Sequence, residues 1–180
     1  MGLDMYLMGK LYLSPFSEEE FAAPVILIDG NTGESKTYET KYFNNKALIN
    51  YINDLFGFVN KKFDIGIKYL EFGLAYWRKA NHIHRWFVEN VQGGDDDCEE
   101  YHVSEEDIKR LLELCNAVAG NHDLAKELLP CKEGFFFGSS DYDDYYFHIT
   151  DDTIRMLEKI LEQLKDPRFA GMDMYYYSSW

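Results

Sequence analysis

Two hydrophobic spacings follow one another along this 180-residue chain, and together they restrict the folds it can adopt. Residues 1–13 alternate Leu3, Met5 and Leu7 with other positions, which is the period of a half-buried strand. Residues 108–118 instead repeat apolar side chains every three to four positions, as helices do. Such segments intermix without a strict strand–helix–strand rhythm. We therefore predict an α+β fold: a single compact domain over residues 1–180, with an antiparallel or mixed sheet and about four helices.

Turn and capping residues divide the chain into further elements. The apolar run 24–29, a turn over 30–33 and residues 35–40 predict a hairpin, which favours antiparallel pairing. Ser104 begins a variant capping box, and Gly120 stops the helix that follows it. The other expected elements are a helix from Asn44 or Asn45 that carries Leu48 to Phe56, a strand over 63–74, a helix over 76–91, a short helix over 121–129, a strand over 135–138, a helix from Thr150 or Asp151, and a closing strand over 174–178.

The charge balance argues against several kinds of partner. Thirty-two acidic residues against eighteen basic ones give a formal net charge of -14, which repels nucleic acid and anionic membranes. Three cysteines without a close pair indicate neither a disulfide framework nor a zinc ribbon. No basic segment followed by an apolar one opens the sequence, and no run of about 18 apolar residues occurs, so we expect neither export nor a membrane span. We expect a cytoplasmic protein with no metal and no cofactor.

One segment departs from this acidic background. Residues 72–88 contain no acid, although they contain several bases and rings: Trp77, Arg78, Lys79, His82, His84, Arg85 and Trp86. On a helix, the basic and the ring-bearing side chains would lie in adjacent stripes. Guanidinium groups clamp phosphate oxygens, rings stack on a base, and Asn81 can read a base edge. The alternative is that both tryptophans are core anchors and the bases pair with surplus acids.

A second polar group follows the apolar run 135–137. Ser139 can donate to an oxyanion, Asp141 can accept from a ribose or from Arg78, and Tyr142 can help to close a pocket. The alternative is a tight turn with solvated acids. No nucleophile–base pair, phosphate loop or metalloprotease motif occurs, so we predict no catalytic residues.

Four segments carry a resemblance to other proteins: MGLDMYL at 1–7, YWRKANHIHRWF at 76–87, FFFGSSDYDDYY at 135–146 and YYYSSW at 175–180. They resemble a family of small uncharacterised proteins encoded by bacteriophages and prophages. Residues 14–45, with the predicted hairpin, look like an insertion into this pattern. The resemblance implies a phage protein in the host bacterial cytoplasm, and such accessory proteins counter bacterial defence by capturing a nucleotide signal or by binding a defence protein. It brings no activity, cofactor or catalytic residue.

Two hypotheses follow. The first is a non-enzymatic binding protein, a sponge for a small anionic nucleotide-like ligand, with contacts from Trp77, Arg78, Asn81, His82, Arg85, Trp86, Ser139, Asp141 and Tyr142. The second is an acidic protein–protein inhibitor of a host defence protein, in which the acids imitate nucleic acid. Residues 175–177 and Trp180 are expected to dock into the core or against a second copy, so the sequence leaves a homo-oligomer open.

Overall fold

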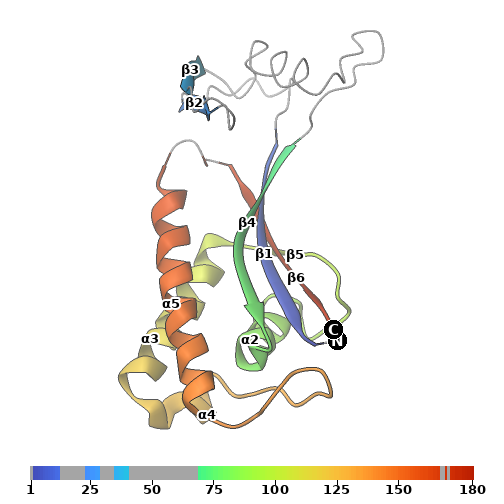
Figure 1. Ribbon diagram of the computed structural model, residues 1–180. Coiled ribbons are helices and arrows are strands. Elements are labelled where there is room, and N and C mark those ends of the chain that lie inside the picture. Colours follow the sequence, from blue (N-terminus) through green and yellow to red (C-terminus); the bar gives the residue numbers. More distant parts are fainter. Residues whose placement is uncertain (1, 13–22, 29–34, 41–68, 167–168, 170) are drawn as a thin grey trace. The chain divides into compact units, whose positions relative to one another are not determined.

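The computed structural model describes residues 2–12, 23–28, 35–40, 69–166, 169 and 171–180 (Figure 1). The chain divides into two compact units. One contains Met1–Gly9, Phe72–Gln163 and Asp173–Trp180, and the other contains Lys10–Glu71 and Leu164–Met172. The helix predicted from residue 44 or 45 onward lies outside the described residues, as does the start of the strand predicted over 63–74.

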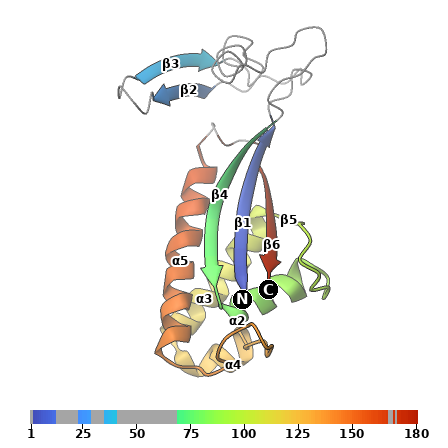
Figure 2. The same cartoon turned by 45° about the vertical axis from the view of Figure 1, so that its right-hand side comes forward.

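A four-stranded antiparallel sheet has the strand order β4-β1-β6-β5 (Figures 1 and 2). Its strands are β1 (Asp4–Tyr12), β4 (Tyr69–Arg78), β5 (Tyr101–Val103) and β6 (Asp173–Ser179). The C-terminal strand β6 lies inside the sheet, where Tyr101 of β5 pairs with Tyr176 and Val103 with Met174. These strands and the helices below confirm the predicted α+β class.

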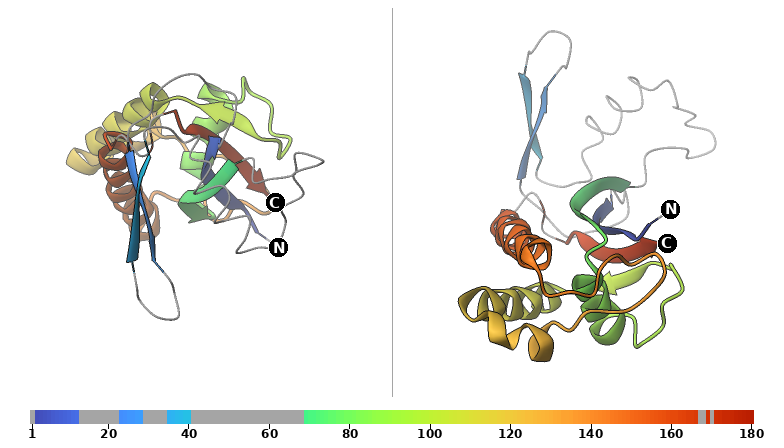
Figure 3. Two further views of the ribbon diagram at one scale, coloured as in Figure 1. Left: turned by 90° about the horizontal axis from the view of Figure 1, so that it is seen from above. Right: turned by 60° about the horizontal axis from the view of Figure 1, so that its bottom comes forward.

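The described helices are α2 (Asn81–Asn90), α3 (Glu105–Gly120), α4 (Ala125–Leu128) and α5 (Asp144–Leu164), with a 3-10 turn η1 (His122–Leu124) before α4. They cover one face of the sheet (Figure 3). The capping box predicted for α3 is present: the Asp107 N–H donates to Ser104 Oγ at 3.1 Å, and the Ser104 N–H donates to Asp107 Oδ2 at 3.0 Å. Such a cap satisfies two donors that the first helical turn would otherwise leave unpaired.

The core lies between the sheet and the helices. Alternate residues of β1 face it, and the side chains of Leu3, Met5 and Leu7 are fully buried, as the period-two pattern predicts. Phe87 of α2 stacks on Tyr176 of β6 with ring centroids 4.0 Å apart. Burial of apolar side chains of this size stabilises the fold by roughly 1.5–3 kcal/mol each.

The boundary between β4 and α2 differs from the prediction. Trp77 and Arg78 belong to the strand, not to the helix that was expected from residue 76. The alternation of the strand continues to its end, since Ala75 and Trp77 are buried whereas Tyr76 and Arg78 are exposed. Lys79, with φ 55°, then turns the chain into the helix. The apolar spacing that suggested a longer helix is thus a strand alternation followed by a helical one.

The strand predicted over 135–138 is wrong. These residues form a turn in which the Phe137 N–H donates to the Gly134 carbonyl at 3.1 Å, and Phe135 is 95% exposed. Three consecutive aromatic residues favour a strand only where a neighbouring strand can pair with them. The loop accepts one backbone hydrogen bond from the residue before β1: the Leu3 N–H donates to the Phe136 carbonyl at 3.0 Å.

The last helix, α5, begins at Asp144 rather than at Thr150 or Asp151. Asp143 accounts for the earlier start, because its Oδ1 accepts from the N–H of Tyr146 at 3.1 Å. Thr150 lies inside the helix, where its hydroxyl donates to the Tyr146 carbonyl at 3.0 Å. A threonine whose hydroxyl donates to the carbonyl four residues earlier can lie inside a helix.

The second unit contains the predicted hairpin. Strands β2 (Ala23–Ile28) and β3 (Ser35–Thr40) pair antiparallel, with Ala23 opposite Thr40 and Ile28 opposite Ser35. The predicted turn over 30–33 lies outside the described residues. That residues 14–45 are an insertion stays a prediction.

Candidate functional site

The sheet face turned away from the helices carries a row of tyrosine rings. Tyr76 of β4, Tyr6 of β1 and Tyr177 of β6 come from three neighbouring strands. The Tyr6 centroid lies 5.4 Å from that of Tyr76, with the rings tilted, and 4.8 Å from that of Tyr177, with the rings stacked. Tyr76 is 49% exposed. Tyr6 and Tyr177 are partly buried, so Tyr76 is the exposed ring of the row, and an exposed aromatic ring is a surface on which a nucleobase can stack.

Two cations follow this row at the end of β4. Arg78 shares the strand face of Tyr76, and its side chain is 60% exposed. Lys79 has a positive φ, a region that residues with a Cβ seldom occupy. If Gly2 had a Cβ, that atom would lie 3.3 Å from Lys79 Cε and 3.9 Å from Arg78 Nη2. Consecutive strand residues point to opposite faces, but the turn at Lys79 brings both side chains to Gly2.

Asp4 lies between the rings and the cations. The Tyr76 hydroxyl donates to Asp4 Oδ1 at 2.5 Å, and Arg78 Nη1 is 3.8 Å from the same oxygen. The hydrogen bond to this carboxylate holds the pKa of Tyr76 above its ordinary value of 10.0. The Tyr145 hydroxyl of α5 donates to the Arg78 carbonyl at 3.0 Å. The end of β4 is therefore fixed through both its side chains and its backbone.

The loop before α5 packs against Lys79. Gly138 has φ +91°, and a Cβ there would lie 3.1 Å from Lys79 Cβ, so a larger residue would be both strained and crowded. Asn81 of α2 holds this loop, because its Nδ2 donates to the carbonyls of Ser139 at 2.6 Å and Phe137 at 3.3 Å. Two predicted ligand contacts, Asn81 and Ser139, therefore lie together, because the Asn81 side chain donates to the Ser139 carbonyl.

The rings that the sequence suggested for stacking are buried. Trp77, His82 and Trp86 are 2%, 3% and 5% exposed. Trp77 Nε1 donates to Thr153 Oγ1 of α5 at 2.9 Å, and His82 Nε2 lies 3.2 Å from the hydroxyl of Thr150. Burial lowers the pKa of His82 from 6.5 to about 3. These positions match the alternative interpretation, in which the tryptophans are core anchors, and they leave no face open for a ligand.

Arg85 is paired within the protein. Its Nε donates to Glu89 Oε1 at 2.7 Å, and its Nη1 donates to the Cys131 carbonyl at 3.2 Å. The Cys131 N–H in turn donates to the Tyr142 hydroxyl at 3.2 Å. Arg85 and Tyr142, both predicted ligand contacts, therefore meet the same loop residue. Part of the basic segment is an ion-pair network, as the alternative interpretation proposed.

Ser139 and Asp141 bond mainly to each other. The Ser139 hydroxyl donates to Asp141 Oδ2, and the Asp141 N–H donates to Ser139 Oγ, both at 3.0 Å. Within the ranges that the structure describes, no contact joins Asp141 to Arg78, the partner that the sequence suggested. These residues form a tight polar turn.

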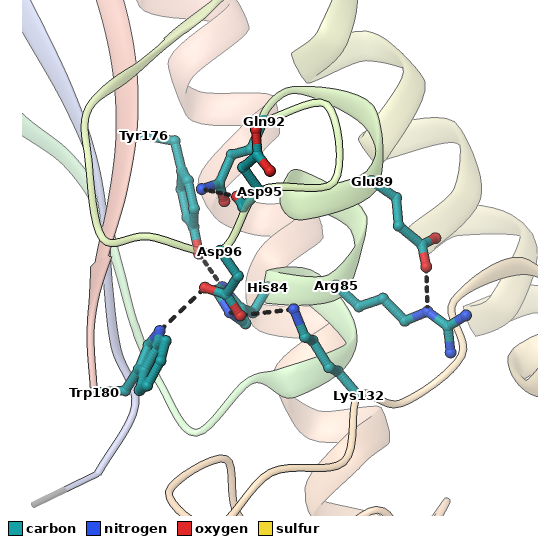
Figure 4. Close-up of polar contacts among 9 residues, drawn as sticks. All are labelled: His84, Arg85, Glu89, Gln92, Asp95, Asp96, Lys132, Tyr176 and Trp180. Atoms are coloured by element: carbon teal, nitrogen blue, oxygen red, sulfur yellow. Dashed lines mark hydrogen bonds and ion pairs between the residues drawn. The ribbon is translucent and has the colours of Figure 1, made fainter.

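A polar cluster that sequence reasoning missed surrounds His84 (Figure 4). His84 Nε2 lies 3.1 Å from Asp96 Oδ2, and His84 Nδ1 lies 2.7 Å from the Tyr176 hydroxyl. Lys132 Nζ donates to Asp96 Oδ2 at 2.6 Å, and Trp180 Nε1 donates to Asp96 Oδ1 at 3.1 Å. Because a carboxylate only accepts, His84 carries its proton on Nε2, and Nδ1 accepts from Tyr176.

The charges of this cluster are balanced. Burial opposes ionisation of Asp96, but the donors Lys132, His84 and Trp180 outweigh it and hold the pKa of this carboxyl below its usual 3.8. Burial lowers the pKa of His84 below 6.5, although Asp96 partly opposes the shift. Burial also raises the pKa of Tyr176 well above 10.0. At neutral pH the cluster therefore holds one carboxylate, one ammonium group and a neutral imidazole.

The order of groups in this cluster is opposite to that in a catalytic triad. In a triad the hydroxyl meets the substrate and the carboxylate supports the histidine from behind. Here Tyr176 is fully buried, whereas the Asp96 side chain is 16% exposed. The cluster therefore joins α2, β6 and two loops, and it presents no nucleophile to a substrate.

No family model, no curated protein and no solved structure matches this chain. None of the helices in the described ranges is long and apolar enough to cross a membrane. Among the same residues, no group of three or more histidine, cysteine or acidic side chains is arranged to hold a metal ion. Function has to be argued from the chemistry of the site itself.

Proposed function

We propose that this protein binds, without catalysis, a small anionic nucleotide-like ligand on the outer face of its sheet. The observation that carries the proposal is that the Tyr6–Tyr76 ring pair leads directly to Arg78 and Lys79. Stacking on an aromatic side chain contributes about 1–3 kcal/mol per base. Arginine and lysine add charge-assisted hydrogen bonds to phosphate. One surface thus offers a tyrosine ring for the base of the ligand and two cations for its phosphate.

The beginning of α2 adds to the positive potential beside Lys79. The first turn of α2 contains no acidic residue, and its N-cap, Ala80, has no side chain that can cap the helix. A helix N-terminus carries a partial positive charge that favours anions. Among the described residues Lys79 makes no ion pair. A cation that makes no ion pair within the described ranges, in a protein of net charge -14, supports an external anion.

Isothermal titration with nucleoside monophosphates, cyclic mononucleotides and cyclic dinucleotides tests the proposal. Arg78→Gln and Lys79→Gln should each weaken the tightest ligand roughly tenfold or more, since a hydrogen bond to a charged group is lost. Arg155→Gln is the matched control, because Arg155 is an exposed arginine of α5 that pairs with Asp152. Melting curves must show that all variants stay folded. If no nucleotide binds or raises the Tm of the parent protein, the proposal fails.

The resemblance to phage-encoded proteins extends the proposal to a sponge that captures a nucleotide signal of bacterial defence in the host cytoplasm. Protein purified from bacteria in which such a defence is active should release a nucleotide on heating, which mass spectrometry would identify. The Arg78→Gln variant purified in parallel should release much less. Equal release from both proteins would place the nucleotide elsewhere.

A second candidate is an acidic inhibitor of a basic partner, and it is favoured by the way the acidic loop after α2 is held. Tyr101 donates to Asp97 Oδ2 at 2.9 Å, and the Glu99 N–H donates to Asp97 Oδ1 at 3.0 Å. An acidic loop braced in this way presents its charge in a defined arrangement. Reversal of the exposed charges Glu99→Lys and Glu100→Lys should remove a captured basic protein in a pull-down. A partner that survives this reversal would count against the inhibitor.

A further inference from the structure

Three kinds of chemical group follow one another along β1 and β4 on the outer face. The Tyr6 and Tyr76 rings come first, 5.4 Å apart. The Asp4 carboxylate and the Arg78 guanidinium come next, 3.8 Å apart. Lys79 lies beyond them, beside Gly2. Neighbouring groups on one strand face are roughly 7 Å apart, because each strand residue adds about 3.4 Å. The order is ring surface, then the Asp4–Arg78 pair, then Lys79.

A ring and a phosphate account for the tyrosines and the cations, but neither can contact the Asp4 carboxylate favourably. The contacts that it makes with Tyr76 and Arg78 both use Oδ1. Its side chain is 24% exposed, and an ionised carboxylate can only accept hydrogen bonds. A phosphate placed against Asp4 would be repelled. The part of the ligand that lies between the ring and the phosphate must therefore bring a hydrogen-bond donor.

We infer that the ligand is a ribonucleotide whose sugar hydroxyl donates to Asp4. This inference rests on the proposed function and adds the class of ligand to it. In a nucleotide the ring, the hydroxyl-bearing sugar and the phosphate follow in the same order as the Tyr6–Tyr76 ring pair, the Asp4–Arg78 pair and Lys79, and the phosphate lies within reach of both cations. Asp4 is then the residue that determines selection of ribose, and a ligand without sugar hydroxyls makes no hydrogen bond to its carboxylate.

Titration of ribonucleoside 5′-monophosphates beside their 2′,3′-dideoxy counterparts tests this inference. The parent protein should bind the ribose form roughly tenfold more tightly, because it alone makes a hydrogen bond to a charged group. In Asp4→Ala this preference should disappear, and the dideoxy form should bind more tightly than it does to the parent, since a like charge near the phosphate is removed. General damage to the site would weaken both forms instead. Asp151→Ala removes an exposed acid of α5 and should leave the preference unchanged.

The outcomes separate this inference from the function on which it rests. Equal affinity of the parent for ribose and dideoxy forms, with both weakened in Arg78→Gln, would overturn the role of Asp4 and leave the proposed function standing. Absence of binding by either form would overturn both. A ribose preference that persists in folded Asp4→Ala would assign the hydroxyl to another residue and would also overturn the inference.

Discussion

The outer sheet face and the His84 cluster contain similar groups but satisfy them differently. In the cluster, Asp96 accepts from three donors and His84 uses both ring nitrogens, so the charges are matched inside the protein. On the outer face, Arg78 is 60% exposed and forms a long ion pair with Asp4, at 3.8 Å, and Lys79 makes no ion pair among the described residues. Matched polar groups rigidify a fold, whereas unmatched charges favour an external partner.

This contrast leads to a division of effects. Substitutions in the His84 cluster should lower the free energy of unfolding and leave ligand affinity unchanged. Substitutions at Arg78 or Lys79 should lower ligand affinity and leave the free energy of unfolding unchanged, because neither side chain is buried. A residue that changed both quantities strongly would break the comparison.

The largest effect on stability is expected for Asp96→Ala. The substitution leaves the buried N–H of His84 and the ammonium of Lys132 without their acceptor, which costs about 3 kcal/mol of the free energy of unfolding. Urea unfolding measures the loss. Asp95→Ala is the control, since Asp95 bonds to Gln92 through its backbone: its carbonyl accepts from Gln92 Nε2 at 2.9 Å, and its N–H donates to the Gln92 carbonyl at 3.3 Å. A change below about 0.5 kcal/mol in Asp96→Ala would show that the cluster contributes little.

Acid should destabilise the protein from about pH 6.5 downward through His82. Its pKa is about 3 when folded, against 6.5 for an ordinary histidine, so the unfolded chain binds a proton in this window and the folded protein does not. The contribution of His82 to the free energy of unfolding is complete above pH 6.5. It is lost as the pH falls towards 3, by about 1.4 kcal/mol per pH unit. Unfolding free energies at pH 7, 6 and 5 give the slope.

His82→Asn isolates this residue from the other acid-sensitive groups. Asparagine keeps a donor for the Thr150 hydroxyl but does not titrate, so the variant should be less stable at pH 7 and less sensitive to acid. His148→Asn is the matched control for the loss of a histidine, because His148 is 65% exposed. An unchanged slope in His82→Asn would mean that His82 is protonated in the folded state.

Elements with a local signal could be predicted from the sequence, and contacts between distant elements could not. The Ser104 cap and the alternation of β1 depend on neighbouring residues, and both were found. The end of β4 depends on pairing, since the Lys79 N–H donates to the Leu3 carbonyl at 2.8 Å. No pattern within residues 76–91 contains that partner, so the helix was started too early.

The same distinction explains which residues of the candidate sites the sequence pointed to and which it did not. Arg78 was singled out because it interrupts an acidic background, and its role as a ligand contact stays a prediction. The ring surface beside it was missed, because Tyr76 meets Asp4 across 72 positions of the chain. The buried cluster was missed for the same reason, since His84 and Tyr176 are 92 positions apart. Periodicity indicates which face of an element is buried but not which polar groups on that face meet.

A smaller effect is expected at the exposed end of the cluster. Trp180→Phe removes the N–H that donates to Asp96 Oδ1 and keeps an aromatic ring against Phe137, whose centroid is 5.8 Å away. Trp180 is 44% exposed, so water can replace the lost donor and the cost should be about 1 kcal/mol. Urea unfolding again gives the value. A loss as large as that of Asp96→Ala would mean that the C-terminal ring holds the whole cluster in place.

The smallest effect is expected for Arg85→Gln, which compares two arginines of one acid-free segment. Arg85 is 37% exposed and pairs with Glu89 one helical turn away, a kind of contact worth only about 0.3–0.5 kcal/mol. Its guanidinium is held by Glu89 and the Cys131 carbonyl, so we expect nucleotide affinity to stay within twofold of the parent while Arg78→Gln loses tenfold. Titration of both variants with the same nucleotide decides the matter. Equal losses would mean that the ligand reaches along α2 and that the site is larger than the outer face of the sheet.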